Sequence, residues 1–136
     1  MLQINRPSLR PETEAFLARR AKGEGLLIDG AWVAAEGGAT IPTLDPATGA
    51  EIGVIPNASA VDVDSAVEAA ARAFKTWKLT PPAERARILW KIADLMEERI
   101  DLLAELETLD QGKALYVGRW AEIPGAIAQF RFFAGQ

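Results

Sequence analysis

The sequence of 136 residues contains no cysteine and no histidine. The absence of cysteine excludes disulfides, thiolate metal clusters and a cysteine nucleophile within this chain. The absence of histidine removes the commonest general base and the commonest metal ligand. The chain as it stands therefore carries no complete active site for thiol or imidazole chemistry.

Long apolar runs and an excess of positive charge are also missing. No stretch approaches the roughly 18 apolar residues of a membrane span, and residues 1–7 lack the apolar core of a signal peptide. We therefore expect a cytoplasmic protein that binds no membrane. The net charge of −4 argues against a nucleic-acid partner, because such proteins carry basic patches. The length suits a single domain with a modest core.

The beginning of the chain predicts a helix over residues 11–22. Pro11, followed by an acidic residue, suits the first turn of a helix. Gly23 and Gly25 are typical of its end. We interpret residues 1–25 as an N-terminal extension that contains this helix.

Four short strands are expected next. Asp29-Gly30 lies between apolar pairs and is a strong hairpin signal. The segment Asp45-Pro46-Ala47-Thr48-Gly49 predicts a second tight connection, because proline suits a turn corner and glycine its exit. The predicted strands cover residues 26–28, 32–33, 40–44 and 51–55.

From Ser59 onward the pattern becomes helical. Ser59 and Asp62 resemble a capping box in which aspartate replaces the usual glutamate. Further apolar faces predict helices from there to Trp77, from Pro82 to about Met96, over 102–109 and from about 114 to the end, with Pro124 as a kink. The first of these faces consists of Val63, Val67, Ala70, Phe74 and Trp77. Strands followed by three or four helices indicate, on pattern alone, a small α+β domain.

Motifs that carry chemistry are few. Gly23-Glu24-Gly25 lacks the third glycine of a dinucleotide fingerprint and precedes a strand, and Gly112-Lys113 lacks the upstream glycine of a P-loop. Seven carboxylates between Asp94 and Asp110 are interpreted as a solvated helix surface. Asp110 is the exception, because a carboxylate at a helix end meets exposed carbonyls and needs a compensating cation or donor.

Several segments occur in the order and spacing of one known protein family. Each is weak by itself, but two of them together are fairly specific: the turn that begins at Asp45, and Glu107-Thr108-Leu109-Asp110-Gln111-Gly112-Lys113. The others are Leu27 to Trp32, Val61 to Trp77, Arg85 to Met96 and Arg131 to Gly135. Together they resemble the amino-terminal region of the NAD(P)-dependent aldehyde dehydrogenase superfamily, where the turn usually begins with asparagine.

The resemblance covers residues 26–136 and implies a fold. That fold is of the α/β class and rich in helix, with short peripheral strands followed by three to four helices. It forms the first, incomplete part of an aldehyde dehydrogenase cofactor-binding domain. Family members are much longer, so the implied partner is the remainder of such a chain or a full-length subunit, and the family forms homo-oligomers.

The resemblance also implies an activity. In the family a cysteine thiolate attacks an aldehyde, hydride passes to the nicotinamide of NAD or NADP, and a glutamate-activated water releases the carboxylate. The nucleophile, the base and the cofactor loop lie further along the chain in the family, so none can be assigned to residues here. We expect this segment alone to bind no cofactor and to be inactive.

One implied site holds a metal ion. In several family members the carbonyls at the positions of Thr43 and Leu44, together with the carboxylate matching Asp110, bind a structural Na⁺ or K⁺. This agrees with the unfavourable placement of Asp110 inferred from its helix end.

A second implied site is the substrate entrance. In the family the helix matching residues 120–129 lines it, and Trp120, Ala121 and Gly125 are the best candidates. The small Gly125 leaves room for a bulky or aromatic aldehyde. Plain core packing is the alternative for Trp120, and a helix contact or a kink at Pro124 is the alternative for Gly125.

Three functional hypotheses remain open at this point. The first is a piece of an aldehyde dehydrogenase, inactive by itself. The second is a non-enzymatic helical interaction module that pairs through apolar faces, and the third is a regulatory fragment that co-assembles with full-length subunits. The final helix is still apolar at Phe132, Phe133 and Ala134, which favours a partner of some kind.

Overall fold

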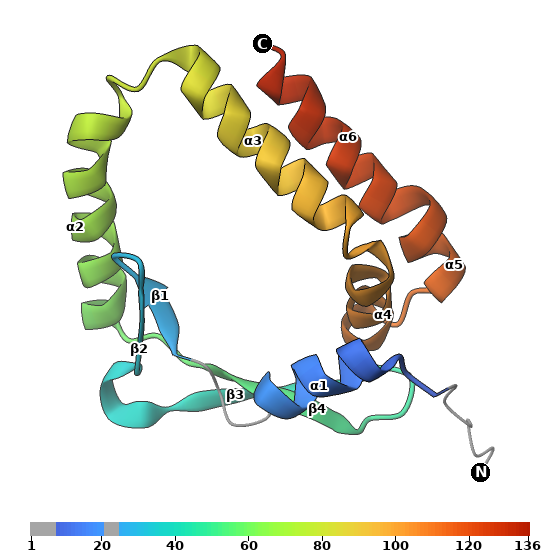
Figure 1. The fold of residues 1–136 in the computed structure, drawn as a ribbon. Coiled ribbons are helices and arrows are strands. Elements are labelled where there is room, and N and C mark those ends of the chain that lie inside the picture. Colours follow the sequence, from blue (N-terminus) through green and yellow to red (C-terminus); the bar gives the residue numbers. More distant parts are fainter. Residues whose placement is uncertain (1–7, 21–24) are drawn as a thin grey trace. The chain divides into compact units, whose positions relative to one another are not determined.

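The computed structural model describes residues 8–20 and 25–136 (Figure 1). These residues form two compact units. The first contains residues 8–14, 45–49 and 80–136, and the second contains residues 15–20, 25–44 and 50–79. Helix α1 (Pro11–Arg20) belongs partly to each unit. The predicted end of this helix at Lys22 lies outside the described residues.

The second unit contains four short strands in two antiparallel pairs. β1 (Leu26–Ile28) pairs with β2 (Ala31–Val33), and β3 (Thr40–Leu44) pairs with β4 (Glu51–Pro56). Asp29 and Gly30 have φ of 54° and 78°. A type I′ turn requires positive φ at both central positions, so the predicted hairpin is confirmed.

Helix α2 (Ala60–Trp77) follows in the same unit and begins with the predicted capping box. The Asp62 amide donates to Ser59 Oγ at 3.2 Å, and the Ser59 amide donates to Asp62 Oδ2 at 2.8 Å. The Glu36 amide also donates to both carboxylate oxygens of Asp62. The backbone bond from Ser59 is the largest of the contacts that lower the pKa of Asp62. The capping box therefore holds the 3-10 turn η1 (Glu36–Gly38) as well as the helix start.

The first unit is built mainly of helices. It contains α3 (Pro82–Glu97), α4 (Ile100–Gln111), α5 (Leu115–Val117), the π-helical turn η2 (Gly118–Glu122) and α6 (Ile123–Ala134). α3 and α6 lie side by side (Figure 1), and Arg131 of α6 pairs with Asp94 and Glu97 of α3 at 3.2 and 2.6 Å. The core of the unit consists of Ala93, Leu102, Ala104, Leu109, Ile127 and Ala134. The expected order of short strands followed by helices is confirmed.

The turn from Asp45 to Gly49 packs against the end of α4. Asp45 is buried and accepts hydrogen bonds from the Ala47 amide at 2.9 Å and from Thr48 Oγ1 at 2.7 Å. α4 ends at Gly112, whose φ is 73°. A Cβ at Gly112 would lie 2.9 Å from Cγ of Pro46. Glycine is therefore needed here both for the left-handed backbone and for the close approach of the turn.

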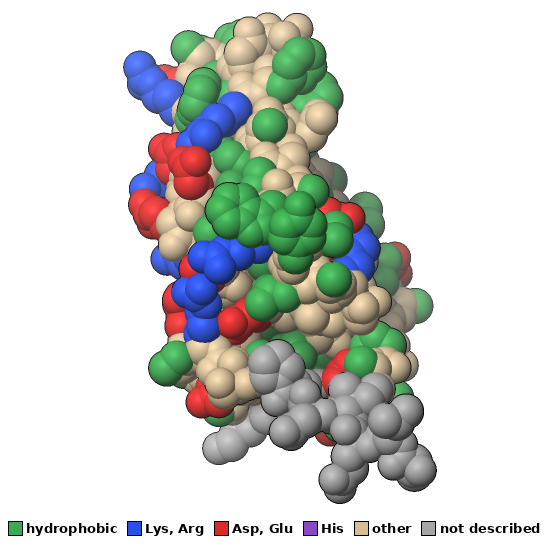
Figure 2. All heavy atoms as spheres, turned by 90° about the vertical axis from the view of Figure 1, so that its right-hand side faces the viewer, with side chains coloured by type: hydrophobic (Ala, Val, Ile, Leu, Met, Phe, Trp, Pro, Cys, Tyr) green, Lys and Arg blue, Asp and Glu red, His purple; other side chains and the backbone are tan. Residues whose placement is uncertain are grey.

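Many large apolar side chains lie on the surface. The α2 residues Val63, Val67 and Phe74, which belong to the predicted apolar face of this helix, are more than half exposed. Figure 2 shows further hydrophobic side chains gathered on the face that carries α5 and α6, with basic and acidic groups beside them. Exposed apolar area of this extent is typical of surfaces that contact another chain or segment. No helix in the described part of the chain is long and apolar enough to cross a membrane.

Candidate functional site

Trp120 and Ala121 lie in the π-helical turn η2 between α5 and α6. The Ile123 amide donates to the carbonyl of Gly118, five residues earlier, where an α-helix would bond four residues apart. Pro124 explains this widening, because a proline has no N–H to donate to the carbonyl of residue 120. The sequence predicted a kink at Pro124. The structure instead shows a π-helical turn directly before it.

Both side chains face solvent in the described structure. Trp120 is 69% exposed among the described residues. Ala121 is exposed, and so is Gly125, which follows four residues later. Residues four apart share one side of a helix. A Cβ at Gly125 would meet nothing within 4 Å, so the glycine is not there to allow a close helix contact among the described residues.

The π-helical turn packs closely against α4. Gly118 is buried, and a Cβ at this position would lie 3.2 Å from Glu107 Oε2 and 3.4 Å from the Cα of Ala104. Lys113 adds an ionic connection, because its ammonium group contacts Glu122 of the turn and Glu107 of α4. The hydrogen bond to Glu122 raises the pKa of Lys113, and the same bond lowers the pKa of Glu122. Both groups are therefore charged at neutral pH, and the turn is fixed to α4.

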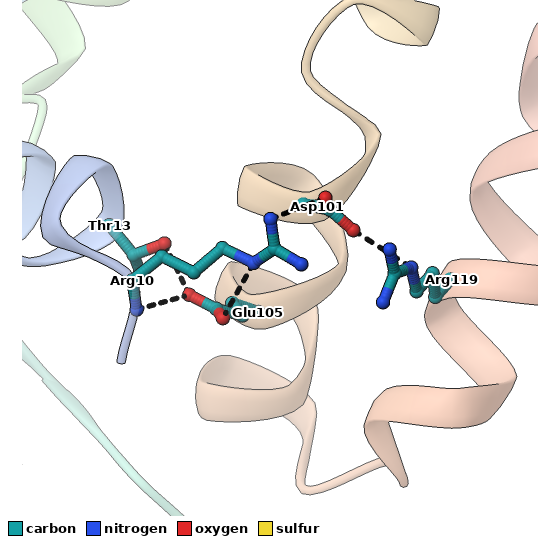
Figure 3. A network of polar contacts seen from close by, with 5 residues as sticks. All are labelled: Arg10, Thr13, Asp101, Glu105 and Arg119. Carbon is teal, nitrogen blue, oxygen red and sulfur yellow. Dashed lines mark hydrogen bonds and ion pairs between the residues drawn. The ribbon is translucent and has the colours of Figure 1, made fainter. Parts of the chain in front are cut away.

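A second polar connection reaches the same turn through the arginine–carboxylate network of Arg10, Thr13, Asp101, Glu105 and Arg119 (Figure 3). Glu105 accepts hydrogen bonds from the Arg10 amide at 3.2 Å and from Thr13 Oγ1 at 2.5 Å. Asp101 pairs with Arg10 on one side and with Arg119 on the other, at 2.5 and 2.8 Å. The network joins residues 10–13, α4 and the π-helical turn.

At Glu105 this network corrects the interpretation of the helix carboxylates as a solvated surface, whereas Asp94, Glu97 and Glu98 are exposed as expected. Glu105 is only 7% exposed. Asp101 and Glu105 are four residues apart and so share one face of α4, which was the available signal. The sequence could not identify their cationic partners, because Arg10 lies about ninety positions away. The sequence prediction therefore missed both arginines.

The residues of the predicted cation site are placed as follows. Thr43 and Leu44 lie at the end of β3 in the second unit, where the pairing with β4 shifts by one residue. Asp110 lies exposed in the last turn of α4 in the first unit. The described residues contain no group of three or more acidic side chains that could hold a metal by themselves. The Na⁺ or K⁺ site stays a prediction.

Comparison with known proteins shows to which family the chain belongs. The sequence model of the aldehyde dehydrogenase family matches residues 32–136. The chain belongs to the aldehyde dehydrogenase family. The resemblance inferred from the turn at Asp45 and from the segment ending at Lys113 is thereby confirmed.

Individual family members match over most of this chain but only part of their own length. An aldehyde dehydrogenase of Paracoccus denitrificans is 47% identical over 79% of this chain and 21% of that protein. A phenylacetaldehyde dehydrogenase of Pseudomonas fluorescens is 39% identical over 81% of this chain and 22% of that protein. The aldehyde dehydrogenase of Bacillus cereus, solved with NAD⁺, is similar with a TM-score of 0.88 and 38% identity, over 96% of this chain and 26% of that one. The chain thus spans about a fifth to a quarter of the family members it matches.

Proposed function

We propose that this chain is the amino-terminal part of an NAD(P)-dependent aldehyde dehydrogenase that oxidises an aldehyde to a carboxylate. The observation that carries the proposal is the match of nearly the whole chain to about a quarter of the Bacillus cereus enzyme, which was solved with NAD⁺. The exposed apolar side chains of α2 add support, because a longer family member has further segments to cover them.

The chemistry of the proposed reaction belongs to groups outside this chain. The proposed nucleophile is a cysteine thiolate, and this sequence contains no cysteine. The nicotinamide cofactor, when bound, accepts a hydride from the substrate. No glycine-rich phosphate loop is present here, so no step of the reaction is assigned to these residues. Their proposed contribution is scaffold and one wall of the substrate entrance.

The proposed entrance wall consists of Trp120, Ala121 and Gly125. Their exposure on the π-helical turn and on the following helical turn supports this role. π-helical turns inside α-helices occur frequently at functional sites. The free space beside Gly125 and the exposed indole of Trp120 favour a bulky or aromatic aldehyde, which would contact the indole face.

The proposed cation site rests on the family resemblance of Thr43, Leu44 and Asp110. Its test is the thermal unfolding midpoint in potassium or sodium chloride against tetramethylammonium chloride at equal ionic strength. A site that includes Asp110 gives a higher midpoint with the alkali cation in the parent chain and no such difference in Asp110→Asn. If the unfolding midpoints of the parent chain and of Asp110→Asn respond equally to the alkali cation, the proposed cation site is wrong. The cytoplasmic location also stays a prediction.

The activity is tested by complementation. The purified chain should form no NADH with any aldehyde, because the thiolate and the cofactor loop are absent. Co-expression with the remainder of the Paracoccus denitrificans enzyme, from which the matching segment has been deleted, should restore NADH formation. The deleted enzyme expressed alone is the control. NADH formation by the isolated chain, free of any full-length enzyme, would contradict the proposal.

Exposed apolar residues also favour a second candidate, a fragment that co-assembles with full-length subunits. Phe132 and Phe133 of α6 are each about 60% exposed, and Leu79 is 76% exposed. Such a fragment would co-purify with a full-length aldehyde dehydrogenase subunit and change its specific activity. A third candidate is an interaction module without any role in aldehyde oxidation. It would unfold cooperatively as an isolated chain and would not bind the full-length subunit.

A further inference from the structure

We propose that Arg10, Asp101 and Arg119 are positioning residues that set the orientation of Trp120 at the substrate entrance. The inference rests on the proposed function for its consequence in catalysis. Its structural basis is a continuous line of contacts from the N-terminal segment through α4 to the indole.

The last contact in this line is made by Arg119, which lies between the Asp101 carboxylate and the Trp120 ring. Its Nε is 2.8 Å from Asp101 Oδ1, and its Cζ is 5.8 Å from the centroid of the Trp120 ring. A guanidinium within about 6 Å of an indole is attracted to the ring. Because Trp120 is 69% exposed, packing restrains its side chain weakly, and the Arg119 contact has a correspondingly large share in fixing the rotamer.

Asp101 is shared by two arginines that approach it from opposite sides (Figure 3). Arg10 Nη1 contacts one carboxylate oxygen at 2.5 Å, while Arg119 contacts the other. The Asp101 side chain is 28% exposed, so solvent screens the pairs in part. A change at Arg10 leaves Asp101 free to turn and thereby changes the restraint on Arg119.

The far end of the line is anchored by Glu105. Its carboxylate binds the backbone amide of Arg10, the hydroxyl of Thr13 and the Arg10 guanidinium, the last at 3.5 Å. The Glu105 side chain is only 9% exposed, and buried carboxylates of this kind are held by several donors. The N-terminal segment is thus fixed to α4 at its backbone as well as at its side chain.

The expected consequence for catalysis differs between aromatic and small aldehydes. If the Trp120 indole rotates freely, an aromatic substrate loses a fixed ring face to contact. A small aldehyde makes little contact with the indole and is therefore affected less. Loss of the Arg10 or Arg119 contact should therefore raise KM for a phenylacetaldehyde-like substrate by about threefold, which is the size expected for a partly exposed ion pair. kcat, and KM for acetaldehyde, should stay unchanged.

The test begins with the Trp120 side chain itself. The chain is labelled with 5-fluorotryptophan, and the Trp120 ¹⁹F resonance is assigned with Trp120→Phe. Arg119→Gln, Asp101→Asn and Arg10→Gln should each shift this resonance, and Arg72→Gln should not. Arg72 is a matched control because it pairs with Asp29 at 3.0 Å in the other unit. Asp101→Glu, which keeps both cations paired, should restore the parent resonance.

The outcomes separate the two proposals. An unmoved Trp120 resonance in Arg10→Gln overturns the line of contacts, whatever the activity of the protein. A shifted resonance in all three variants, with native far-UV circular dichroism, supports it even if no aldehyde is oxidised, which would instead count against the proposed function. In the complemented enzyme, an equal rise of KM for acetaldehyde and for phenylacetaldehyde would overturn the role in specificity.

Discussion

Gly112 and Gly125 are two glycines of the same unit in opposite situations. Gly112 has a left-handed backbone and faces Pro46 at close range, whereas Gly125 lies in helix α6 with open space around it. We expect Gly112→Ala to lower the free energy of unfolding by about 1–2 kcal/mol, because of the left-handed strain and the added clash. Gly125→Ala should raise it by up to about 1 kcal/mol, since alanine favours helix. Urea denaturation measures both, and equal effects of the two changes would contradict this description of the α4 end.

Glu105 is a residue whose removal leaves buried donors without an acceptor. Glu105→Ala should lower the free energy of unfolding by about 2 kcal/mol, because the Arg10 amide and the Thr13 hydroxyl lose their partner. Glu105→Gln keeps one oxygen acceptor and should cost less. Denaturant titration of both variants gives the comparison. A cost for Glu105→Ala as small as that of an exposed control, Glu98→Ala, would show that the network contributes nothing to stability.

Predictions for single residues succeeded where the interacting residues are close in sequence and failed where they are far apart in sequence. The capping pair Ser59 and Asp62, and the turn glycine Gly30, are defined by neighbours within three positions. The burial of Glu105 depends on Thr13, 92 positions away, and no spacing rule reveals such a partner. The exposure of Trp120 was likewise hidden, because an indole on an apolar stripe is more often buried.

The start of helix α2 depends on a carboxylate whose pKa is lowered. The backbone hydrogen bond from Ser59 is the largest cause of the shift at Asp62. A lowered folded-state pKa contributes stability that is complete above the ordinary pKa of about 3.9 and is lost as pH falls through the lower folded value. We therefore expect the urea midpoint of the parent chain to fall more steeply between pH 5 and pH 2, taken as roughly the range of aspartate titration, than that of Asp62→Asn.

The matched control for this element is Asp64→Asn, which removes an exposed carboxylate from the same helix. This control should retain the acid sensitivity of the parent chain. Parallel pH profiles for the parent and Asp62→Asn would contradict the assignment of the capping box as an acid-labile contact.

At the level of elements, the pattern predicted helices and hairpins well but not the type of the last helix. Pro124 showed that the regular hydrogen bonding had to break, since proline lacks an N–H. The π-helical turn that the structure shows also places Gly118 close to Ala104 and is held by the contacts of Lys113. Those contacts are tertiary, and the sequence alone does not reveal them.

At the scale of the whole chain, the described residues leave the apolar face of α2 exposed. Val67 of α2 is 62% exposed. Val67→Glu should change the free energy of unfolding of the isolated chain by less than about 0.5 kcal/mol, as for other surface changes, yet it should prevent assembly with the remainder of the enzyme. Glu68→Gln, also exposed on α2, is the control that should leave assembly intact. Assembly of Val67→Glu at parental strength would exclude this face as the contact.

The family, too, is a property of the whole sequence, because several weak motifs in one order identify it where no single motif does. The activity can be examined by transplanting this chain into a complete enzyme. Residues 8–136 replace the matching segment of the Bacillus cereus aldehyde dehydrogenase, and NADH formation is measured with acetaldehyde and with phenylacetaldehyde. We expect an active chimera in which Gly125→Met raises KM for the aromatic aldehyde more than for acetaldehyde. A folded, correctly assembled chimera without aldehyde-dependent NADH formation would contradict it.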